Sequence, residues 1–178
     1  MSLLSNTEPR ETEGIKWAKL QRWARQAADN AAISYVMGGL LTDIRPGDTE
    51  GVKFAKLQRW IRLLADNIGT PSPYVEAGLT TDIEVGDTEG VKIAKLQRWV
   101  RVVATNFGPV TPAGLLSDVD VSDVDGVKWM KLQRWLRAAV DNAGYAYTAV
   151  GLTRDIEHGD TPGVRWAILQ RWMKLLAN

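Results

Sequence analysis

The side chains that could do chemistry in this chain recur in one short string, Gln-Arg-Trp, which occurs five times. Successive copies start 37, 39, 36 and 37 residues apart. An arginine guanidinium can hold a carboxylate through two hydrogen bonds, and a tryptophan ring can stack on a cation, a sugar or a base. The residue after the tryptophan differs in every copy, so retention of the string indicates a repeated contact. The residues of these strings are Gln21, Arg22, Trp23, Gln58, Arg59, Trp60, Gln97, Arg98, Trp99, Gln133, Arg134, Trp135, Gln170, Arg171 and Trp172.

Aspartates recur between the strings and offer the carboxylates that these arginines need. We predict that the arginines pair with loop aspartates between neighbouring repeats, and that this contact fixes the register of the repeats. Each tryptophan is expected at the edge of the core, with a stem such as that of Lys56 or Arg59 across its ring. The expected acidic partners are Asp43, Asp48, Asp82, Asp87, Asp118, Asp123, Asp155 and Asp160.

A ligand-binding groove is the more specific functional alternative for the same residues. Lys53, Lys56 and Arg59 follow one another at intervals of three beside Trp60, and repetition of this set would suit a sugar chain or a single-stranded nucleic acid. The net charge of +1 and the replacement of the second lysine by Ile168 in the last copy argue against nucleic acid. A glycan stays open as a ligand.

Residues for catalysis or metal binding form no complete pattern. The single histidine, His158, lies in a predicted loop, and acids beside Gly and Thr are typical of helix caps and turns. The segment 118–126 has the alternating oxygen ligands of a calcium loop, but Asp123 stands where that loop needs glycine and Trp129 where it needs glutamate. We therefore predict a protein that is not an enzyme and has no cofactor and no metal site.

Each copy of the string lies within one predicted amphipathic helix. In the second copy Thr49 supplies a capping oxygen, Glu50 puts a negative charge into the first turn, and Asn67 with Gly69 gives a stop signal. The predicted helices run near Thr12–Ala28, Thr49–Ala65, Thr88–Ala104, Val124–Val140 and Thr161–Ala177.

The connections between these helices are about 20 residues long and end on a second recurring phrase that starts with Gly-Leu. Ser72-Pro73 and Thr111-Pro112 have the form of a helix cap followed by proline, which predicts a short helix before the Gly-Leu step. An extended conformation at Tyr35-Val36 or Tyr74-Val75 is the alternative.

The faces of the long helix predict how the copies pack. Phe54, Trp60, Ile61 and Leu64 fall within about 60° of Leu57 on a helical wheel and form one apolar face. Further apolar residues on the opposite flank indicate that each helix is touched from two sides. A helix of this length is marginal alone in water, so each copy must gain its order from its neighbours.

We therefore predict an all-α chain of five tandem repeats of about 37 residues, packed as a compact array or a small solenoid. Each repeat comprises one long helix and an irregular or short-helical connection, and the repeats form a single domain. The expected units are residues 1–30, 31–68, 69–107, 108–143 and 144–178.

Composition excludes several classes of protein. With 22 basic and 21 acidic side chains, the chain has no overall field that would draw it onto nucleic acid or an anionic membrane. The absence of cysteine excludes disulfides and thiol chemistry. We see neither a secretory signal at the start nor an uncharged apolar stretch of about 18 residues, so we expect a soluble chain.

The two ends of the array suggest contacts with other chains. Residues 1–11 form a polar run suited to a flexible or partner-bound arm. The last predicted helix carries Trp166, Trp172, Met173, Leu175 and Leu176, and this apolar surface needs a cover. Closure of the helices into a bundle and docking on another subunit would both provide one, and we favour the assembly contact.

A family resemblance rests on three copies of one tripeptide. Gly47-Asp48-Thr49, Gly86-Asp87-Thr88 and Gly159-Asp160-Thr161 each lead into an amphipathic helix that ends near Asn or Gly. This pattern resembles the short helical repeats of bacteriophage virion proteins, including tail, fibre and collar components. The fourth copy departs from it with Ser122-Asp123-Val124, and the first keeps only Thr12 with Glu13. The resemblance implies a non-enzymatic structural part of a virus particle, present in several copies.

The expected function is therefore that of a structural or attachment protein, a tail, fibre, collar or head-associated component of a phage virion. It would be made in the host cytoplasm and work through protein–protein contacts with other virion subunits or with itself. Two alternatives stay open. A cytoplasmic helical-repeat adaptor would expose an apolar stripe, and a glycan-binding module would show uncovered tryptophan rings.

Overall fold

The computed structural model describes residues 4–8, 10–70, 77–84 and 86–178. Within these residues the regular elements are helical, with one isolated bridge between Gly38 and Leu41 and no strand longer than that. This confirms the all-α prediction. The elements are α1 (Glu13–Asn30), α2 (Glu50–Asn67), α3 (Glu89–Phe107), α4 (Asp125–Asn142) and α5 (Pro162–Leu176), with the 3-10 turns η1 (Gly78–Thr80), η2 (Gly114–Leu116) and η3 (Gly151–Thr153).

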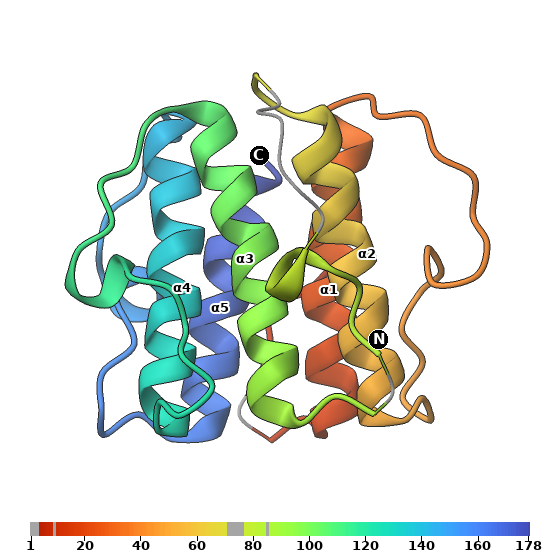
Figure 1. Ribbon diagram of the computed structural model, residues 1–178, viewed down its shortest axis with the longest axis horizontal. Helices are drawn as coiled ribbons and strands as arrows, with labels where there is room; N and C mark the ends of the chain where they lie inside the picture. Colours follow the sequence, from red (N-terminus) through yellow and green to blue (C-terminus); the bar gives the residue numbers. More distant parts are fainter. Residues whose placement is uncertain (1–3, 9, 71–76, 85) are drawn as a thin grey trace.

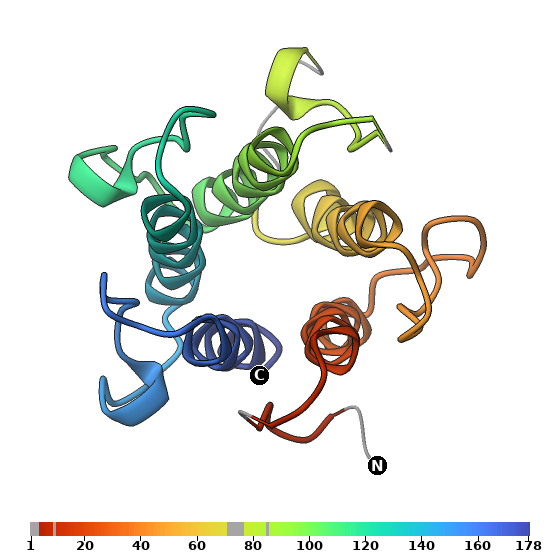
Figure 2. The same ribbon diagram turned by 90° about the horizontal axis from the view of Figure 1, so that it is seen from below.

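The long helices stand side by side around a central axis and close into a ring (Figures 1 and 2). Each helix packs on the next one in the sequence, and α5 packs on α1. All of them begin at the same end of the ring, so neighbouring helices are parallel (Figure 1). The compact array is therefore formed as a closed ring, and not as the open solenoid that the repeats also allowed.

The helices begin within one residue of the predicted positions, after an extended capping residue such as Thr49 or Val124. Four of them run past the predicted ends, and in α3 and α4 an asparagine of the last turn bonds to the preceding helix. Asn106 Nδ2 donates to Ala65 O at 2.6 Å, and Asn142 Nδ2 donates to Ala104 O at 3.1 Å. Contacts between helices thus accompany the last turns that the local stop signals did not predict.

Where the structure describes them, the connections run along the outside of the ring between the far end of one helix and the start of the next (Figures 1 and 2). An extended chain rises about 3.3 Å per residue and a helix only about 1.5 Å, so the return favours extended backbone. The short helix predicted at Thr111-Pro112 is accordingly wrong, because these residues are not helical and the 3-10 turn starts at Gly114. Gly114 has a φ of 54°, which favours glycine. The matching prediction at Ser72-Pro73 lies outside the described residues.

Apolar layers fill the axis of the ring. One layer is made of the leucines that precede each Gln-Arg-Trp string, and the next of the variable residues that follow it. The first layer comprises Leu20, Leu57, Leu96, Leu132 and Leu169, all buried. The second comprises Ala24, Ile61, Val100, Leu136 and Met173, also buried. The axial cavity among these and adjoining residues measures only about 10 Å³, so the centre is solid.

Closure of the ring corrects the expectation for the last helix. Its apolar residues Trp166, Trp172, Met173 and Leu176 are buried, and α5 packs on α1 and α4 within the same chain. The apolar residues of α5 therefore need no second subunit as a cover, because α1 supplies the missing neighbour. Among the described helices, none combines the length and the apolar character needed to cross a lipid bilayer.

Candidate functional site

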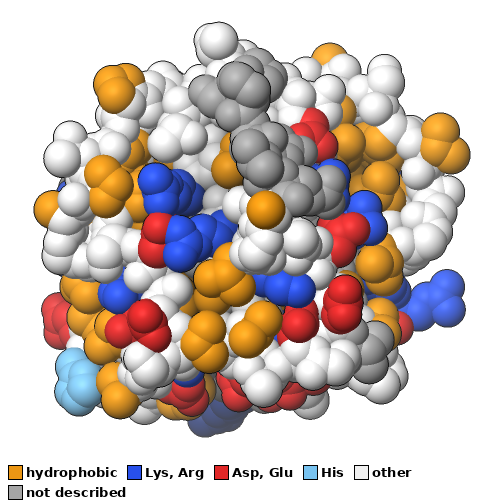
Figure 3. Space-filling model, viewed as in Figure 1, with side chains coloured by type: hydrophobic (Ala, Val, Ile, Leu, Met, Phe, Trp, Pro, Cys, Tyr) orange, Lys and Arg blue, Asp and Glu red, His pale blue; other side chains and the backbone are white. Residues whose placement is uncertain are grey.

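The structure places the Gln-Arg-Trp tryptophans between neighbouring helices and not on the surface. Trp60, Trp99, Trp135 and Trp172 are 0% exposed, and Trp23 is 9% exposed. These rings have no free face for a sugar or a base. Lys56, one of the lysines of the alternative groove, is also buried, and Figure 3 shows basic and acidic side chains interspersed on this outer face, with no continuous basic strip.

The glutamines of the first four strings each bind the backbone of an extended segment in the following connection. Gln58 Oε1 accepts from the backbone N–H of Ile83 at 2.8 Å, while its Nε2 donates to the backbone oxygen of Thr81 at 2.8 Å. The glutamine thus replaces the hydrogen-bonding partners that a neighbouring strand would offer. The same clamp from Oε1 holds the backbone N–H of Ile44, Val119 and Ile156. Sequence reasoning selected these glutamines but missed this role.

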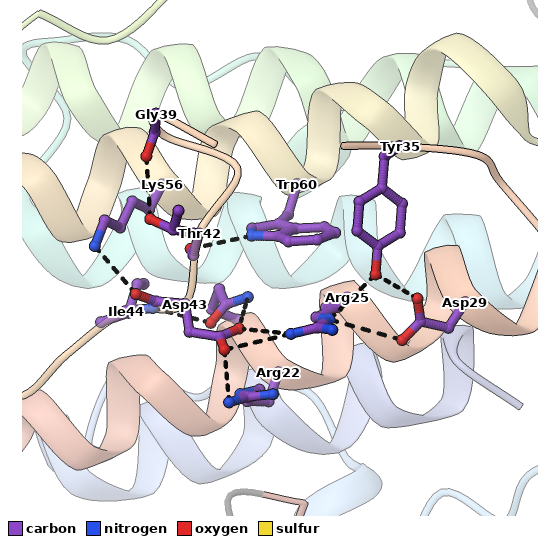
Figure 4. A network of polar contacts seen from close by, with 11 residues as sticks. Arg22, Arg25, Asp29, Tyr35, Gly39, Thr42, Asp43, Ile44, Lys56 and Trp60 are labelled. Atoms are coloured by element: carbon purple, nitrogen blue, oxygen red, sulfur yellow. Dashed lines mark hydrogen bonds and ion pairs between the residues drawn. The ribbon is translucent and has the colours of Figure 1, made fainter. Parts of the chain in front are cut away.

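The structure brings four of the five string arginines, those on α1 to α4, together with the aspartate of the next connection, as Figure 4 shows for Arg22 and Asp43. Arg22 Nη2 lies 2.6 Å from Asp43, and Arg134 Nη1 lies 3.0 Å from Asp155. The corresponding pairs are Arg59 with Asp82 and Arg98 with Asp118. A second arginine, three residues later on the same helix face, shares each carboxylate and was missed. The second arginines are Arg25, Arg62, Arg101 and Arg137.

These second arginines also correct the expected stacking on the tryptophans. The cation over each ring comes from the preceding helix, and not from Lys56 or Arg59 on the same helix. The Arg25 guanidinium lies 5.9 Å from the Trp60 ring centre, and the Tyr35 ring meets Trp60 edge-on at 4.9 Å. Parallel neighbours at one height place the arginine of one helix opposite the tryptophan of the next (Figure 4).

The aspartates that precede the helices pair with the lysine of the following string. Lys56 Nζ lies 2.7 Å from Asp48, and Asp87 and Asp123 pair likewise with their lysines. Burial raises the pKa of Asp48, but hydrogen bonds from Lys56 and from the backbone of Arg45 lower it overall. In the last copy, where the lysine is replaced by isoleucine, Arg154 binds Asp160 at 2.5 Å instead.

The residues considered for catalysis and for calcium binding lie mostly in the connections between the helices. His158 is exposed in a connection. Asp118 contacts arginines and Asp123 contacts Lys131, so two acids of the calcium-like segment are held by cations. In the part of the chain that the structure describes, no three acidic or histidine side chains come together in a way that could hold a metal ion.

The polar arm at the start of the chain docks on the ring, which corrects the expectation of a flexible or partner-bound arm. Gln170 clamps it as other glutamines clamp a connection, donating to Ser5 O at 2.8 Å and accepting from Thr7 N at 2.7 Å. Lys19 Nζ donates to Asn6 O at 2.8 Å and also contacts Glu11. The arm therefore fills the position of the second half of a connection. The signal for it was the likeness of Leu3-Leu-Ser-Asn-Thr7 to Leu40-Leu-Thr-Asp-Ile44.

One departure within the arm gives a stability prediction. Asn6 stands where the other connections have an aspartate, and Arg171 and Lys174 stand at the repeat positions of Arg22 and Arg25. We expect Asn6→Asp to raise the free energy of unfolding by about 0.3–1 kcal/mol, as a partly exposed ion pair does. The unfolding temperature should rise by about 1–4 °C in calorimetry. Asn6→Gln is the uncharged control, and an equal rise in this control would contradict the explanation.

An opening with a mixed polar and aromatic lining lies at the end of the ring where the helices begin. It is a cup of about 270 Å³, and we call it the amino-end cup. Its rim carries the exposed first residues of α1 to α4, while α5 contributes Pro162. Its floor is made largely of aromatic rings from the first turns. The rim carboxylates belong to Glu13, Glu50, Glu89 and Asp125, and the rings to Trp17, Phe54, Trp129 and Trp166.

The rings of the floor hold one another in fixed orientations. The Trp17 ring centre lies 4.5 Å from that of Phe54 and 4.4 Å from that of Trp166, in edge-to-face contact. Trp129 lies 5.1 Å from Trp166 in a tilted arrangement. Such pairs are favourable contacts in themselves, so the floor is rigid before any ligand arrives.

The amino-end cup carries an excess of negative charge. Four carboxylates line it against two basic side chains, Lys16 and Arg165. Burial, followed by repulsion from Asp125, Glu50 and Glu13, raises the pKa of Glu89, although Lys128 acts in the opposite direction. The acids face the positive ends of parallel helix dipoles, which favours them, yet they still repel one another. Sequence reasoning read one of these acids as a first-turn charge and did not place them in one site.

Comparison with known proteins gives no support from relatives. No family model, curated protein or solved structure matches this chain. The interpretation of the amino-end cup therefore rests on its own geometry, and the resemblance to phage repeats stays a prediction.

Proposed function

We propose that this chain is a non-enzymatic attachment protein that holds a cationic side chain of a protein partner in its amino-end cup. The observation that carries the proposal is the combination of a carboxylate rim with a floor of aromatic rings in one opening of about 270 Å³. Carboxylates attract a guanidinium or an ammonium group, and aromatic rings stabilise it once it is desolvated.

The size of the amino-end cup favours a single side chain over an extended ligand. Its volume lies just below the range of about 300–1,000 Å³ that is usual for small-molecule sites. An arginine is the better fit, because its planar guanidinium can contact carboxylates at its edge and rings at its face. The closed ring adds rigidity, so little conformational entropy is lost when a partner binds.

The virion part of the proposal comes from the resemblance of the Gly-Asp-Thr segments. A rigid ring with one charged, concave end suits a tail, fibre, collar or head-associated component that contacts other virion subunits. A cellular adaptor would use the same end of the ring, and it differs only in the partner. The burial of the string tryptophans gives the glycan-binding alternative no surface.

A matched pair of small molecules tests the amino-end cup directly. We expect acetyl-arginine amide to bind with a change in tryptophan fluorescence, and the isosteric but neutral acetyl-citrulline amide to bind at least tenfold more weakly. Glu50→Gln with Glu89→Gln should weaken arginine binding about five- to tenfold, because each tenfold step corresponds to about 1.4 kcal/mol. Glu84→Gln, an exposed acid that does not line the cup, is the matched control. Equal binding of the citrulline compound overturns the proposal.

The raised pKa of Glu89 predicts a pH dependence with a defined sign. Its pKa lies above the ordinary value of 4.5, so the carboxylate protonates at a higher pH than that value. Arginine binding should therefore weaken as the pH falls through this raised pKa. For stability the sign is opposite: ionisation of Glu89 opposes folding, so Glu89→Gln should stabilise the chain at pH values above about 4.5 and have little effect below. Titration of binding and of urea unfolding across this range checks both effects.

A further inference from the structure

The amino-end cup is not uniform around the ring, because its α5 side differs from the sides that α1 to α4 form. Each of those four helices has an acid at its first position and a lysine three residues later, as in Glu50 and Lys53. In α5 the acid is replaced by Pro162 and the lysine by Arg165, and both residues line the cup. The side formed by α5 therefore contributes a cation and no acid.

The acid that precedes α5 in the chain does not neutralise Arg165. The pKa of Asp160 is lowered mainly by its hydrogen bonds from Arg154, and Arg165 contributes only as a more distant charge. Arg154 Nη2 lies 2.5 Å from the Asp160 carboxylate. Asp160 is therefore already bound by another arginine.

The rim acid on the neighbouring helix also has another partner. The Arg165 guanidinium reaches the first turn of α4, where its Nη2 lies 3.6 Å from the position that a Cβ on Gly126 would take. The adjacent Asp125 lies 3.7 Å from Lys128 on its own helix. Asp125 thus forms its ion pair within α4 and not with Arg165.

Arg165 consequently has a guanidinium that no carboxylate of the described residues binds. Its Nε is buried without a hydrogen-bond partner, and it forms no ion pair in this part of the chain. The Nε of Arg22 is also unpaired, but Arg22 binds Asp43 through Nη2 at 2.6 Å. A half-buried guanidinium gains from a carboxylate, which it can bind through two hydrogen bonds. The α5 side of the cup is therefore suited to an anionic group of the ligand.

The acidic and the basic side of the cup face each other across the ring. Because α5 packs on α1 and α4, the remaining helices α2 and α3 stand opposite to it (Figure 2). Their first residues, Glu50 and Glu89, line the cup, as Arg165 does. A ligand that spans the cup meets carboxylates at one end and a guanidinium at the other.

We infer that the residue bound in the amino-end cup is the carboxy-terminal arginine of the protein partner. Its guanidinium binds Glu50 and Glu89, and its terminal carboxylate binds Arg165 on the opposite side. An arginine inside a chain carries no such carboxylate and would leave Arg165 without an ion pair. This inference rests on the proposed function and deepens it, since it gives the position of the bound residue in the partner chain.

Acetyl-arginine and acetyl-arginine amide test this inference, because they differ only in the terminal carboxylate. We expect the full chain to bind acetyl-arginine about fivefold more tightly than the amide, as measured by tryptophan fluorescence. Arg165→Gln should weaken the binding of acetyl-arginine and strengthen that of the amide, because a like charge leaves the cup. Lys53→Gln is the matched control, since Lys53 has the same place in its repeat but does not line the cup. This control should keep the preference for the carboxylate.

The outcomes separate this inference from the proposed function. Equal binding of the two ligands to the unmodified chain, or a preference that survives Arg165→Gln, overturns the inference and leaves the proposed function standing. The ligand pair decides this even if Arg165→Gln does not fold. Binding of acetyl-arginine amide no tighter than that of acetyl-citrulline amide overturns the proposed function itself. Tighter binding of free arginine than of acetyl-arginine would indicate a free amino acid as the ligand, and would also overturn the inference of a chain end.

Discussion

Trp135→Ala lowers the free energy of unfolding by about 3–5 kcal/mol, as expected when a fully buried aromatic side chain is truncated. Trp135 is 0% exposed between α3 and α4, and its Nε1 donates to Ser117 O at 3.2 Å. The Arg101 guanidinium lies 5.5 Å from the ring centre and loses this contact. Domains of this kind are stable by about 5–15 kcal/mol, so a large share of the stability is lost. Urea unfolding followed by circular dichroism measures the loss.

Trp129→Ala is the matched control, since it removes the same side chain from the same helix. Trp129 is only partly buried and lines the amino-end cup, so we expect a smaller loss of about 1–2 kcal/mol. Binding of acetyl-arginine amide should respond in the reverse order, with a strong loss for Trp129→Ala. Equal losses of stability for the two variants would contradict the distinction between a tryptophan of the helix interface and one of the cup.

The long helices could be predicted because their signals are local. Capping threonines such as Thr49 and the apolar spacing around Leu57 depend only on the neighbouring residues in the chain, and α2 begins one residue after Thr49. Closure of the ring could not be predicted in this way. It depends on the rotation from one repeat to the next, and thus on how Ala24, Val100 and Met173 share the axis. One repeat alone does not contain this information.

The contacts of the candidate site were likewise predictable from the sequence only in part. Opposite charges that recur at fixed places in each repeat predicted pairs such as Arg22 with Asp43, which the structure brings together. The amino-end cup has no such signal, because an acid such as Glu89 at a helix start is already explained by the helix dipole. It becomes part of a site only when parallel helix starts meet at one end of a ring.

Deletion of residues 1–11 should also cost about 3–5 kcal/mol of unfolding free energy, because it removes several hydrogen bonds worth about 1 kcal/mol each and the Lys19–Glu11 ion pair. Lys19 is 1% exposed, and its Nζ contacts Asn6 O at 2.8 Å and the Glu11 carboxylate, both on the arm. Deletion also removes the two backbone partners of the Gln170 side chain. Urea unfolding of the full and the shortened chain at neutral pH measures the loss.

Two further measurements separate the buried charge from a general effect of shortening. Lys19→Met in the full chain keeps the arm and removes only its contacts with the Lys19 ammonium, so it should cost less stability than the deletion. Burial raises the pKa of Glu11, but hydrogen bonds from Lys19 and from the backbone of Glu8 lower it overall. This contribution of the arm is therefore present above the ordinary pKa of 4.5 and is lost as the pH falls through the lowered value. The difference between the two chains should shrink in acid, and a difference that stays constant, or a shortened chain as stable as the full one, would show that the arm does not neutralise Lys19.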